Sequence, residues 1–224
     1  MNKHTLNQLI KNLPPRPGIM GREKFFNAAV LIPLLQKNDE YFFLFEKRAK
    51  NIRQGGEISF PGGKFEPFQD KFCVNAALRE TEEEIGIPRE KIEVIGRLDT
   101  FISPRGIIIE SFIGILNIDM EKDLNPDKNE VEEIFIIPVS WFEKHPPEQY
   151  GVKVEMKPYF INKDGVKVST LPVEELGLPP QYQNPWPSLD YEVFVFKNPV
   201  ALIWGITARL IVELMLKINP NYLS

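Results

Sequence analysis

The stretch Gly62-Gly63-Lys64, followed after a spacer by Arg79-Glu80-Thr81-Glu82-Glu83-Glu84-Ile85-Gly86-Ile87, decides the fold of this chain. It places a glycine turn ahead of a helix that is predicted over about 72–85. At roughly 100° per residue, three carboxylates span about 100° of one helix face, and they belong to Glu80, Glu83 and Glu84. Side chains suited to a core gather on another face, at Val74, Leu78, Thr81 and Ile85. One side of the helix can therefore pack inward while the other presents a dense anionic patch.

The acidic face of this helix predicts a site for a divalent cation. Like charges one turn apart cost about 0.2–0.5 kcal/mol per pair, and Mg²⁺ or Mn²⁺ would remove that repulsion because hard cations prefer carboxylate oxygens. A solvated acidic face is the alternative. The neighbouring residues favour the cation: Arg79 can hold a carboxylate by paired hydrogen bonds, Gly86 suits the end of the helix, and the turn at Gly62 lets backbone approach a ligand closely.

These residues resemble the Nudix box of the Nudix hydrolases. The positions that match it are Gly63, Arg79, Glu80, Glu83, Glu84, Gly86 and Ile87. Three features depart from the usual form. The spacer between Gly63 and Arg79 is longer, Asp70 stands one place from the usual glutamate, where Lys71 is found, and Thr81 replaces an aliphatic residue.

A second set of residues is similar to the signature of the coenzyme A pyrophosphatase branch of that family. The matching segments are Arg48-Ala49-x-x-x-Arg53, Gly56-Glu57-x-x-Phe60-Pro61-Gly62-Gly63, Asp70 ahead of Arg79, and Ile203-Trp204-Gly205-x-Thr207-Ala208-Arg209. The gap from Arg53 to Gly56 is one residue shorter than in the signature. Together the matches run from about residue 28 to about residue 212, so the resemblance covers most of the chain.

The resemblance implies an α/β fold, the Nudix α/β/α sandwich with a mixed β-sheet. It implies an enzyme that uses Mg²⁺ or Mn²⁺ to hydrolyse the pyrophosphate of coenzyme A or acyl-coenzyme A, giving an adenosine bisphosphate and a phosphopantetheine. A hydrolase of another nucleoside diphosphate derivative, such as ADP-ribose or a dinucleotide, is the second interpretation. A Nudix-fold binding or regulatory module is the third, and the intact set of glutamates argues against it.

The roles expected by resemblance fall into three groups. The metal ligands are Glu80, Glu83, Glu84 and the backbone carbonyl of Gly63. The catalytic residues are Arg79, Glu80, Glu83 and Glu130. Within these groups, Glu83 is a further ligand or the base, Arg79 orients the glutamates without touching substrate, and Glu130 is either an extra catalytic glutamate or part of a solvated acidic turn. The residues expected to bind substrate are Arg48, Arg53, Gly62, Lys64 and Arg105.

The arginines are expected to hold phosphate because a guanidinium group matches phosphate geometry. Arg48 and Arg53 lie in the loop that leads into the glycine turn, and Arg105 lies in a turn at 103–106 that can cap the substrate. Ordinary solvation in loops is the alternative for all three. For Trp186, stacking on a base is weighed against anchoring of a loop, and anchoring is favoured.

Composition and length agree with one domain over residues 1–224. We expect an N-terminal arm at 1–26 with a short helix and a Pro-rich segment, a Nudix core at 28–144, and an insertion at 145–190 followed by a strand and a helix that complete 145–224. The net charge of −4 gives no general attraction to nucleic acid or anionic membranes. The single Cys73 excludes an internal disulfide and is expected to be a small buried side chain.

Strands are expected near 28–35, 41–47, 57–60, 92–98, 107–117, 131–137 and 191–196, with a short helix at 139–144 and hairpin-like pieces around 152–161 and 166–169. A last helix is expected over about 199–217. Its polar residues, Arg209, Glu213 and Lys217, form one stripe, which indicates a docking helix and no membrane span. The expected protein is cytoplasmic, acts on a small-molecule pyrophosphate, and is a monomer or a homodimer.

Overall fold

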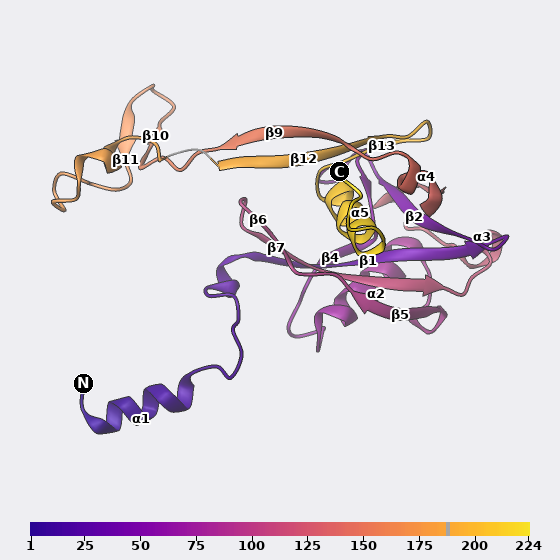
Figure 1. The fold of residues 1–224 in the computed structure, drawn as a ribbon, viewed down its shortest axis with the longest axis horizontal. Helices are drawn as coiled ribbons and strands as arrows, with labels where there is room; N and C mark the ends of the chain where they lie inside the picture. The colour runs from indigo at the N-terminus through magenta and orange to yellow at the C-terminus, as the bar shows by residue number, and fades with distance from the viewer. Residues whose placement is uncertain (187–188) are drawn as a thin grey trace.

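The computed structural model describes residues 1–186 and 189–224, and within them an eight-stranded mixed sheet forms the centre of the molecule (Figure 1). Its main path runs β3-β2-β1-β7-β5, with β4 on β1, β6 on β7 and β8 on β2. The pairing of β1 with β7 is parallel and the others are antiparallel. The strands are β1 (Phe26–Lys37), β2 (Glu40–Arg48), β3 (Ile58–Ser59), β4 (Gly62–Lys64), β5 (Ile92–Arg97), β6 (Phe101–Ser103), β7 (Ile107–Leu116) and β8 (Val131–Pro138).

The alternation of side chains along β1 and β2 divides the interior into two cores, because successive residues of a strand point to opposite faces. Ala29, Leu31 and Leu35 of β1 pack on one side with Leu44 of β2 and with α2 (Cys73–Ile85). The other face receives Val30, Ile32 and Leu34 of β1, and Phe43 and Phe45 of β2. The central strand is therefore covered on both sides.

The helix α2 has the amphipathic character that its sequence predicts. Ala76, Ala77, Thr81 and Ile85 are buried against the sheet, and Gly86 ends the helix in the left-handed conformation with φ 77°. Thr81, which replaces an aliphatic residue, donates its hydroxyl hydrogen bond to the carbonyl of Ala77 at 2.7 Å. The hydroxyl is thus satisfied inside the helix, so threonine is tolerated in the core.

The opposite face of the sheet is covered by α5 (Gly205–Ile218) together with a three-stranded sheet of order β13-β12-β9. These strands are β9 (Glu148–Val154), β12 (Leu189–Lys197) and β13 (Leu202–Trp204). The α/β/α sandwich is confirmed, with this small sheet added to the layer of α5 (Figure 1). The hydroxyl of Thr207 ties α5 to β3 by donating to the carbonyl of Ile58 at 3.0 Å.

One expectation about the C-terminal half is wrong. The helix expected over about 199–217 begins at Gly205, because Ile203 and Trp204 pair with Phe196 and Val195 of β12 as strand β13. The hairpin-like pieces expected around 152–161 and 166–169 are confirmed in part, since residues 159–161 pair with residues 167–169 as an antiparallel hairpin. Residues 152–154 belong instead to β9, which pairs with β12, a partner more than thirty residues away.

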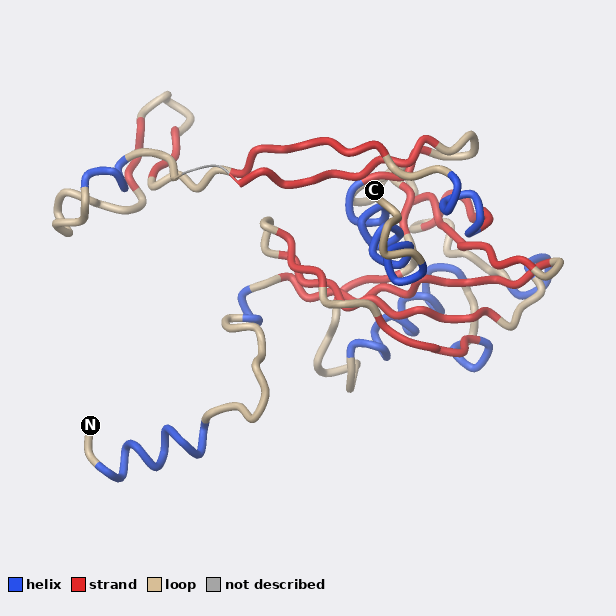
Figure 2. The backbone as a smooth tube through the Cα atoms, viewed as in Figure 1, coloured by secondary structure: helices blue, strands red, loops and turns tan. Residues whose placement is uncertain are grey.

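The remaining elements lie at the periphery, as Figure 2 shows. The ribbon of β9 and β12 leads to a distal unit, which we define as residues 155–186 and which contains β10 (Tyr159–Ile161), β11 (Lys167–Ser169) and the short helix η3 (Pro180–Gln183). The expected N-terminal helix is α1 (Lys3–Asn12), which buries no residue and lies apart from the sheet. The other short helices are η1 (Arg22–Lys24), η2 (Arg89–Lys91), α3 (Met120–Asp123) and α4 (Val139–Lys144). None of the helices in the described part of the chain is long and apolar enough to cross a bilayer.

Candidate active site

The glycine turn holds two of the three predicted glutamates of α2. Gly62 and Gly63 belong to β4, which pairs with β1. The backbone N–H of Gly62 donates to Oε2 of Glu84 at 2.9 Å. A Cβ at Gly63 would lie 2.4 Å from Cδ of Glu80, so only glycine lets this carboxylate approach the turn. The turn and the helix are therefore one site, as the sequence predicts.

Arg79 binds the neighbouring carboxylates tightly. Its Nη1 lies 2.9 Å from both Glu80 Oε1 and Glu83 Oε2. Its Nε and Nη2 donate to the two oxygens of Asp70 at 3.2 and 3.1 Å, and Nη2 also donates to the carbonyl of Lys64 at 3.1 Å. This geometry agrees with the expectation that Arg79 orients the glutamates, and it shows why the spacer carries Asp70.

Asp70 is only 2% exposed, yet it is held as a carboxylate. Burial opposes ionisation, but hydrogen bonds from Arg79 and from the backbone N–H of Glu66 outweigh it, so the pKa of Asp70 is lowered. The same hydrogen bond from Arg79 to Asp70 raises the pKa of the guanidinium group. We name Arg79 with Asp70, Glu80 and Glu83 the Arg79 cluster.

A second cluster, which the sequence does not predict, surrounds Arg48. Its Nη1 lies 3.5 Å from Oε1 of Glu46 and 3.7 Å from Oε1 of Glu84. Its Nε donates to the carbonyl of Arg53 at 3.3 Å. Arg48 therefore connects the buried carboxylates with the loop that carries Arg53. We name Arg48 with Glu46 and Glu84 the Arg48 cluster.

The carboxylates of the Arg48 cluster are hard to ionise. Burial, followed by the charge of Glu46, raises the pKa of Glu84 to about 9. Burial likewise raises the pKa of Glu46 to about 7, against a hydrogen bond from Ser59 that lowers it. The pKa of Glu80 is raised too, chiefly by burial. Nearby positive charge would reverse all three shifts, since it favours the ionised form.

The other candidates lie at different distances from this centre. Glu83 is more exposed than Glu80 and Glu84. Glu130 precedes β8, and its charge raises the pKa of both Glu46 and Glu80, which places it beside the site. The side chain of Lys64 pairs with Glu66 at 3.6 Å and is not among the residues that line the cavity described next.

A cavity of about 480 Å³ opens beside the glycine turn, between the central sheet and the layer of α5. Three arginines and the turn contribute to its polar lining: Arg48, Arg53, Arg105 and Gly62. Its apolar lining includes Val30, Phe60, Val152, Val193, Trp204 and Leu210. No carboxylate of the described residues forms an ion pair with Arg53 or Arg105. The C-terminal segment 203–209, which the sequence marks as a motif, thus supplies a wall of the cavity.

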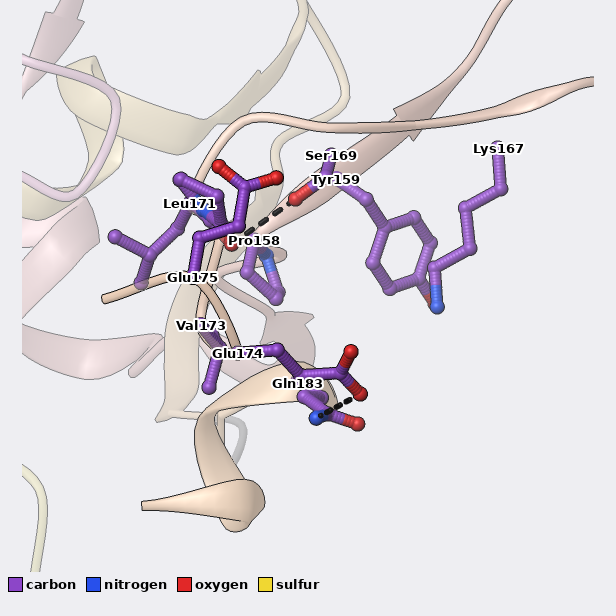
Figure 3. A pocket seen from close by; sticks show the side chains of 10 residues that line it. Pro158, Tyr159, Lys167, Ser169, Leu171, Val173, Glu174, Glu175 and Gln183 are labelled. Carbon is purple, nitrogen blue, oxygen red and sulfur yellow. Dashed lines mark hydrogen bonds between the residues drawn. The ribbon is translucent and has the colours of Figure 1, made fainter. Parts of the chain in front are cut away.

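A separate cavity of about 290 Å³ belongs to the distal unit, between the β10–β11 hairpin and η3 (Figure 3). Tyr159, Lys167, Glu174 and Gln183 are among its lining residues, and Gln183 donates to Glu174 at 3.0 Å. It lies far along the ribbon from α2 (Figure 1). Trp186 also belongs to this unit, where its ring packs edge-on against Tyr182 at 5.9 Å, in agreement with an anchoring role.

The NUDIX domain model matches residues 25–159, which is more than half of the chain and includes the glycine turn, α2 and Glu130. The chain belongs to the Nudix family. Membership supports the assignment of an enzyme that hydrolyses pyrophosphate compounds with a divalent metal ion. Of the predicted site, the glycine turn, the glutamates of α2, Arg48 and Arg53 lie together, and Glu46 is the residue of the site that the sequence did not single out.

Relatives within the family extend the comparison. The chain is 34% identical over 135 residues to the uncharacterized Nudix hydrolase NudL of Photorhabdus laumondii, a match covering 60% of this chain and 70% of that protein. It is 32% identical over 127 residues to the peroxisomal coenzyme A diphosphatase NUDT7 of Mus musculus, covering 56% of this chain and 52% of the mouse protein. The chain thus spans about half the length of the mouse relative.

Solved structures are similar to this chain at lower sequence identity. An Ap4A hydrolase of C. elegans in a binary complex has a TM-score of 0.44 at 19% identity, covering 53% of this chain and 84% of that chain. A MutT/nudix family protein of Enterococcus faecalis has a TM-score of 0.47 at 16% identity, covering 96% of this chain and 68% of that chain.

The residues of the site fit a hard divalent cation. The donor set is made of carboxylates, one buried carboxylate oxygen of Glu46 has no hydrogen-bond partner, and Gly63 leaves room for Glu80 at the turn. Among the described residues, no three acidic, His or Cys side chains already surround one point at metal-ligand distance. The arginines contact Oε1 of Glu80, Glu46 and Glu84, and Oε2 of Glu46 has no hydrogen-bond partner.

Proposed function

We propose that this protein hydrolyses the pyrophosphate bond of coenzyme A or an acyl-coenzyme A, releasing an adenosine bisphosphate and a phosphopantetheine. The single observation that carries the proposal is the composition of the 480 Å³ cavity. It joins the glycine turn at the carboxylates to two arginines without ion-pair partners among the described residues, and then to an apolar wall. A substrate with a pyrophosphate, a further phosphate and apolar groups matches this sequence of surfaces.

Arg53 and Arg105 are the groups that would receive the further phosphate. Both line the cavity, and a guanidinium without a carboxylate partner is available for charge-assisted hydrogen bonds. Trp204, Val152 and Val193 form an apolar surface for a base or for the pantetheine arm. The similarity to the mouse coenzyme A diphosphatase supports the same class of substrate.

The reaction balances with water alone. A water oxygen attacks one phosphorus of the anhydride, the P–O–P bond breaks, and the second phosphate leaves, while a carboxylate takes the proton of the water. Glu130 and Glu83 are the candidates for that base. A bound Mg²⁺ or Mn²⁺ supplies neutralisation of the phosphate oxygens and a lower pKa for the attacking water. Glu80, Glu84 and the carbonyl of Gly63 hold the cation, and Arg79 keeps the glutamates in place.

The test is a panel of pyrophosphate substrates with Mg²⁺ and Mn²⁺, with products identified by mass. We expect coenzyme A to be cleaved with a higher kcat/KM than dephospho-coenzyme A, ADP-ribose and dinucleotides. In Arg53→Ala, the preference for coenzyme A over its dephosphorylated form should fall about 10–100-fold, because a charge-assisted hydrogen bond contributes about 1.5–3 kcal/mol. Arg89→Ala is the control, since Arg89 pairs with Glu82 at 2.8 Å and its side chain lies outside the cavity.

Two results would decide against the proposal. A parent protein that does not distinguish coenzyme A from dephospho-coenzyme A contradicts the phosphate site at Arg53. A preference for ADP-ribose or a dinucleotide would move the protein to the second substrate class. Equal losses on both substrates in Arg53→Ala would place the arginine on the pyrophosphate itself.

A further inference from the structure

Glu46 is a fully buried carboxylic acid on a central strand, where an ionisable side chain is rare unless it is paired. It belongs to β2, two residues after Leu44, so it points to the same side of the sheet as Leu44. That side is the one that α2 covers. The backbone therefore directs Glu46 toward the helix that carries Glu80 and Glu84.

The two oxygens of Glu46 have different surroundings. Oε1 accepts a hydrogen bond from the hydroxyl of Ser59 at 2.9 Å and lies 3.5 Å from Nη1 of Arg48. Oε2 is buried and has no hydrogen-bond partner. An unpartnered buried carboxylate oxygen is costly, and native proteins keep one where a proton, a water or an ion completes it.

Glu46 and Glu84 are close neighbours. Each has its Oε1 within 3.7 Å of the same nitrogen, Nη1 of Arg48. The other oxygen of Glu84 binds the N–H of Gly62, in the turn at which the metal site is expected. One guanidinium group at 3.5 and 3.7 Å is a weak partner for two buried carboxylates, because charge-assisted hydrogen bonds are normally about 2.7–2.9 Å long.

From these contacts we infer that Glu46 is a further carboxylate of the divalent-metal centre, where its free Oε2 binds the cation or one of its waters beside Glu84. The inference rests on the metal-dependent hydrolysis proposed above, and it adds a ligand from the sheet to those from α2. The centre then draws carboxylates from two elements that face each other across the α2 core. Ser59 and Arg48 act as positioning residues, since both contact Oε1 and leave Oε2 without a partner.

The competing explanation is that Glu46 stays protonated and serves only to pack the interior with its hydrogen bond to Ser59. The two explanations differ in what a cation does. A metal-centre carboxylate contributes to cation affinity, whereas a neutral packing group does not. The decisive quantity is therefore the affinity for Mn²⁺ itself, measured without substrate.

The experiment compares Mn²⁺ binding by calorimetry, and by the electron paramagnetic resonance signal of free Mn²⁺, in the full-length parent and in Glu46→Gln. Glutamine keeps the shape of the side chain and the oxygen that accepts from Ser59, but removes the charge. We expect the dissociation constant for Mn²⁺ to rise about 10–100-fold, as is typical for groups that support metal ligands. The rise in melting temperature that Mn²⁺ gives the parent should shrink accordingly.

Glu110→Gln is the matched control, because Glu110 is a largely buried glutamate on the sheet that is paired with an arginine, Arg22 at 3.0 Å, but lies outside the Arg48 cluster. It should bind Mn²⁺ as the parent does. Glu46→Gln should melt cooperatively without metal, which separates loss of affinity from loss of fold. An Mn²⁺ affinity of Glu46→Gln within twofold of the parent overturns the inference.

The outcome is independent of the substrate. A parent that binds Mn²⁺ tightly and loses affinity in Glu46→Gln, but does not cleave coenzyme A, upholds the inference and contradicts the proposed substrate. A parent that cleaves coenzyme A while Glu46→Gln keeps its Mn²⁺ affinity upholds the proposed substrate and contradicts the inference about Glu46. A parent that binds no Mn²⁺ contradicts the inference outright.

Discussion

The Arg79 cluster and the Arg48 cluster flank the same helix, yet they are built in opposite ways. In the Arg79 cluster the contacts from guanidinium to carboxylate are 2.9–3.2 Å, and the buried Asp70 receives two of them. In the Arg48 cluster the contacts are 3.5 and 3.7 Å, and one carboxylate oxygen has no partner. The pKa of Asp70 is lowered, whereas those of Glu46 and Glu84 are raised.

The difference indicates a division of labour. Each carboxylate of the Arg79 cluster has a close contact with the guanidinium, so this cluster fixes the spacer loop and the helix in place. In the Arg48 cluster both carboxylates are buried, their contacts with the guanidinium are long and one oxygen has no partner, so it is the part of the site that gains most from an added cation. Each substitution predicted below acts on one cluster and leaves the other intact, and the last prediction compares the two clusters directly.

The largest effect is expected from Glu84→Gln. It removes the carboxylate that we propose as a principal metal ligand in the Arg48 cluster, so turnover should fall at least about 100-fold. The fold should persist, since the amide oxygen of glutamine can still accept from the N–H of Gly62. Steady-state kinetics beside the parent tests this, with Glu82→Gln as the control, because Glu82 lies on the same helix and pairs with the distant Arg89. Undiminished turnover, or turnover of the parent in excess chelator, would contradict the assignment.

Arg79→Ala should reduce stability as well as activity. It leaves Asp70 buried without its cation, and breaking a buried ion pair costs about 3–5 kcal/mol. Because Arg79 is partly exposed, we expect the lower end, about 3 kcal/mol, from the midpoint of urea unfolding. The double variant with Asp70→Asn should recover part of the loss, since the stranded charge is then gone. A midpoint equal to that of the parent would show that the cluster does not fix the fold.

The sequence predicts those parts of the site that depend on residues within one helix or strand. The glutamates of α2 and the end of the helix at Gly86 depend on a periodicity that lies within one element, and both are confirmed. Predicting the position of Glu46 in the site requires two observations. Alternation along β2 indicates that Leu44 and Glu46 share a face, but not that α2 covers this face, and the second fact comes only from the packing of the sheet.

Trp204 illustrates the same limit. Its helical spacing with the residues after it favours a helix, but pairing with Val195 on β12 draws it into a strand. β12 also pairs with β9, which is separated from it by the distal unit. Pairing with a strand that precedes residue 199 overrides local propensity here, so the wall of the cavity could not be predicted from residues 199–217 alone.

Arg48→Ala should give a smaller effect of a different kind. Its contacts are long, so the free energy of unfolding should change by less than about 1 kcal/mol. Its Nε does hold the loop of Arg53 through the hydrogen bond to the carbonyl of Arg53 at 3.3 Å, so kcat/KM for coenzyme A should fall about 10-fold. Lys47→Ala is the control, since Lys47 pairs with the exposed Glu132. A loss of stability as large as that of Arg79→Ala would mean that the two clusters stabilise the fold equally.

The smallest expected effect is on the pH dependence of stability in chelator, where the two clusters act in opposite directions. Asp70, whose pKa is lowered from 3.8, contributes stability that is present above that value and is lost as the pH falls below it. Glu46 and Glu84, raised from 4.5 to about 7 and about 9, bind more protons in the folded state, so their contribution is present below pH 4.5 and is lost as the pH rises to 9. The melting temperature should therefore decline by a few degrees between pH 5 and pH 9.

Saturating Mn²⁺ should reduce this decline in melting temperature because it favours the ionised carboxylates. Glu84→Gln should reduce it without metal because one of the two groups is gone. A melting temperature that rises over this range in chelator would show that Glu46 and Glu84 are ionised and satisfied without a cation, and the contrast between the two clusters would fail.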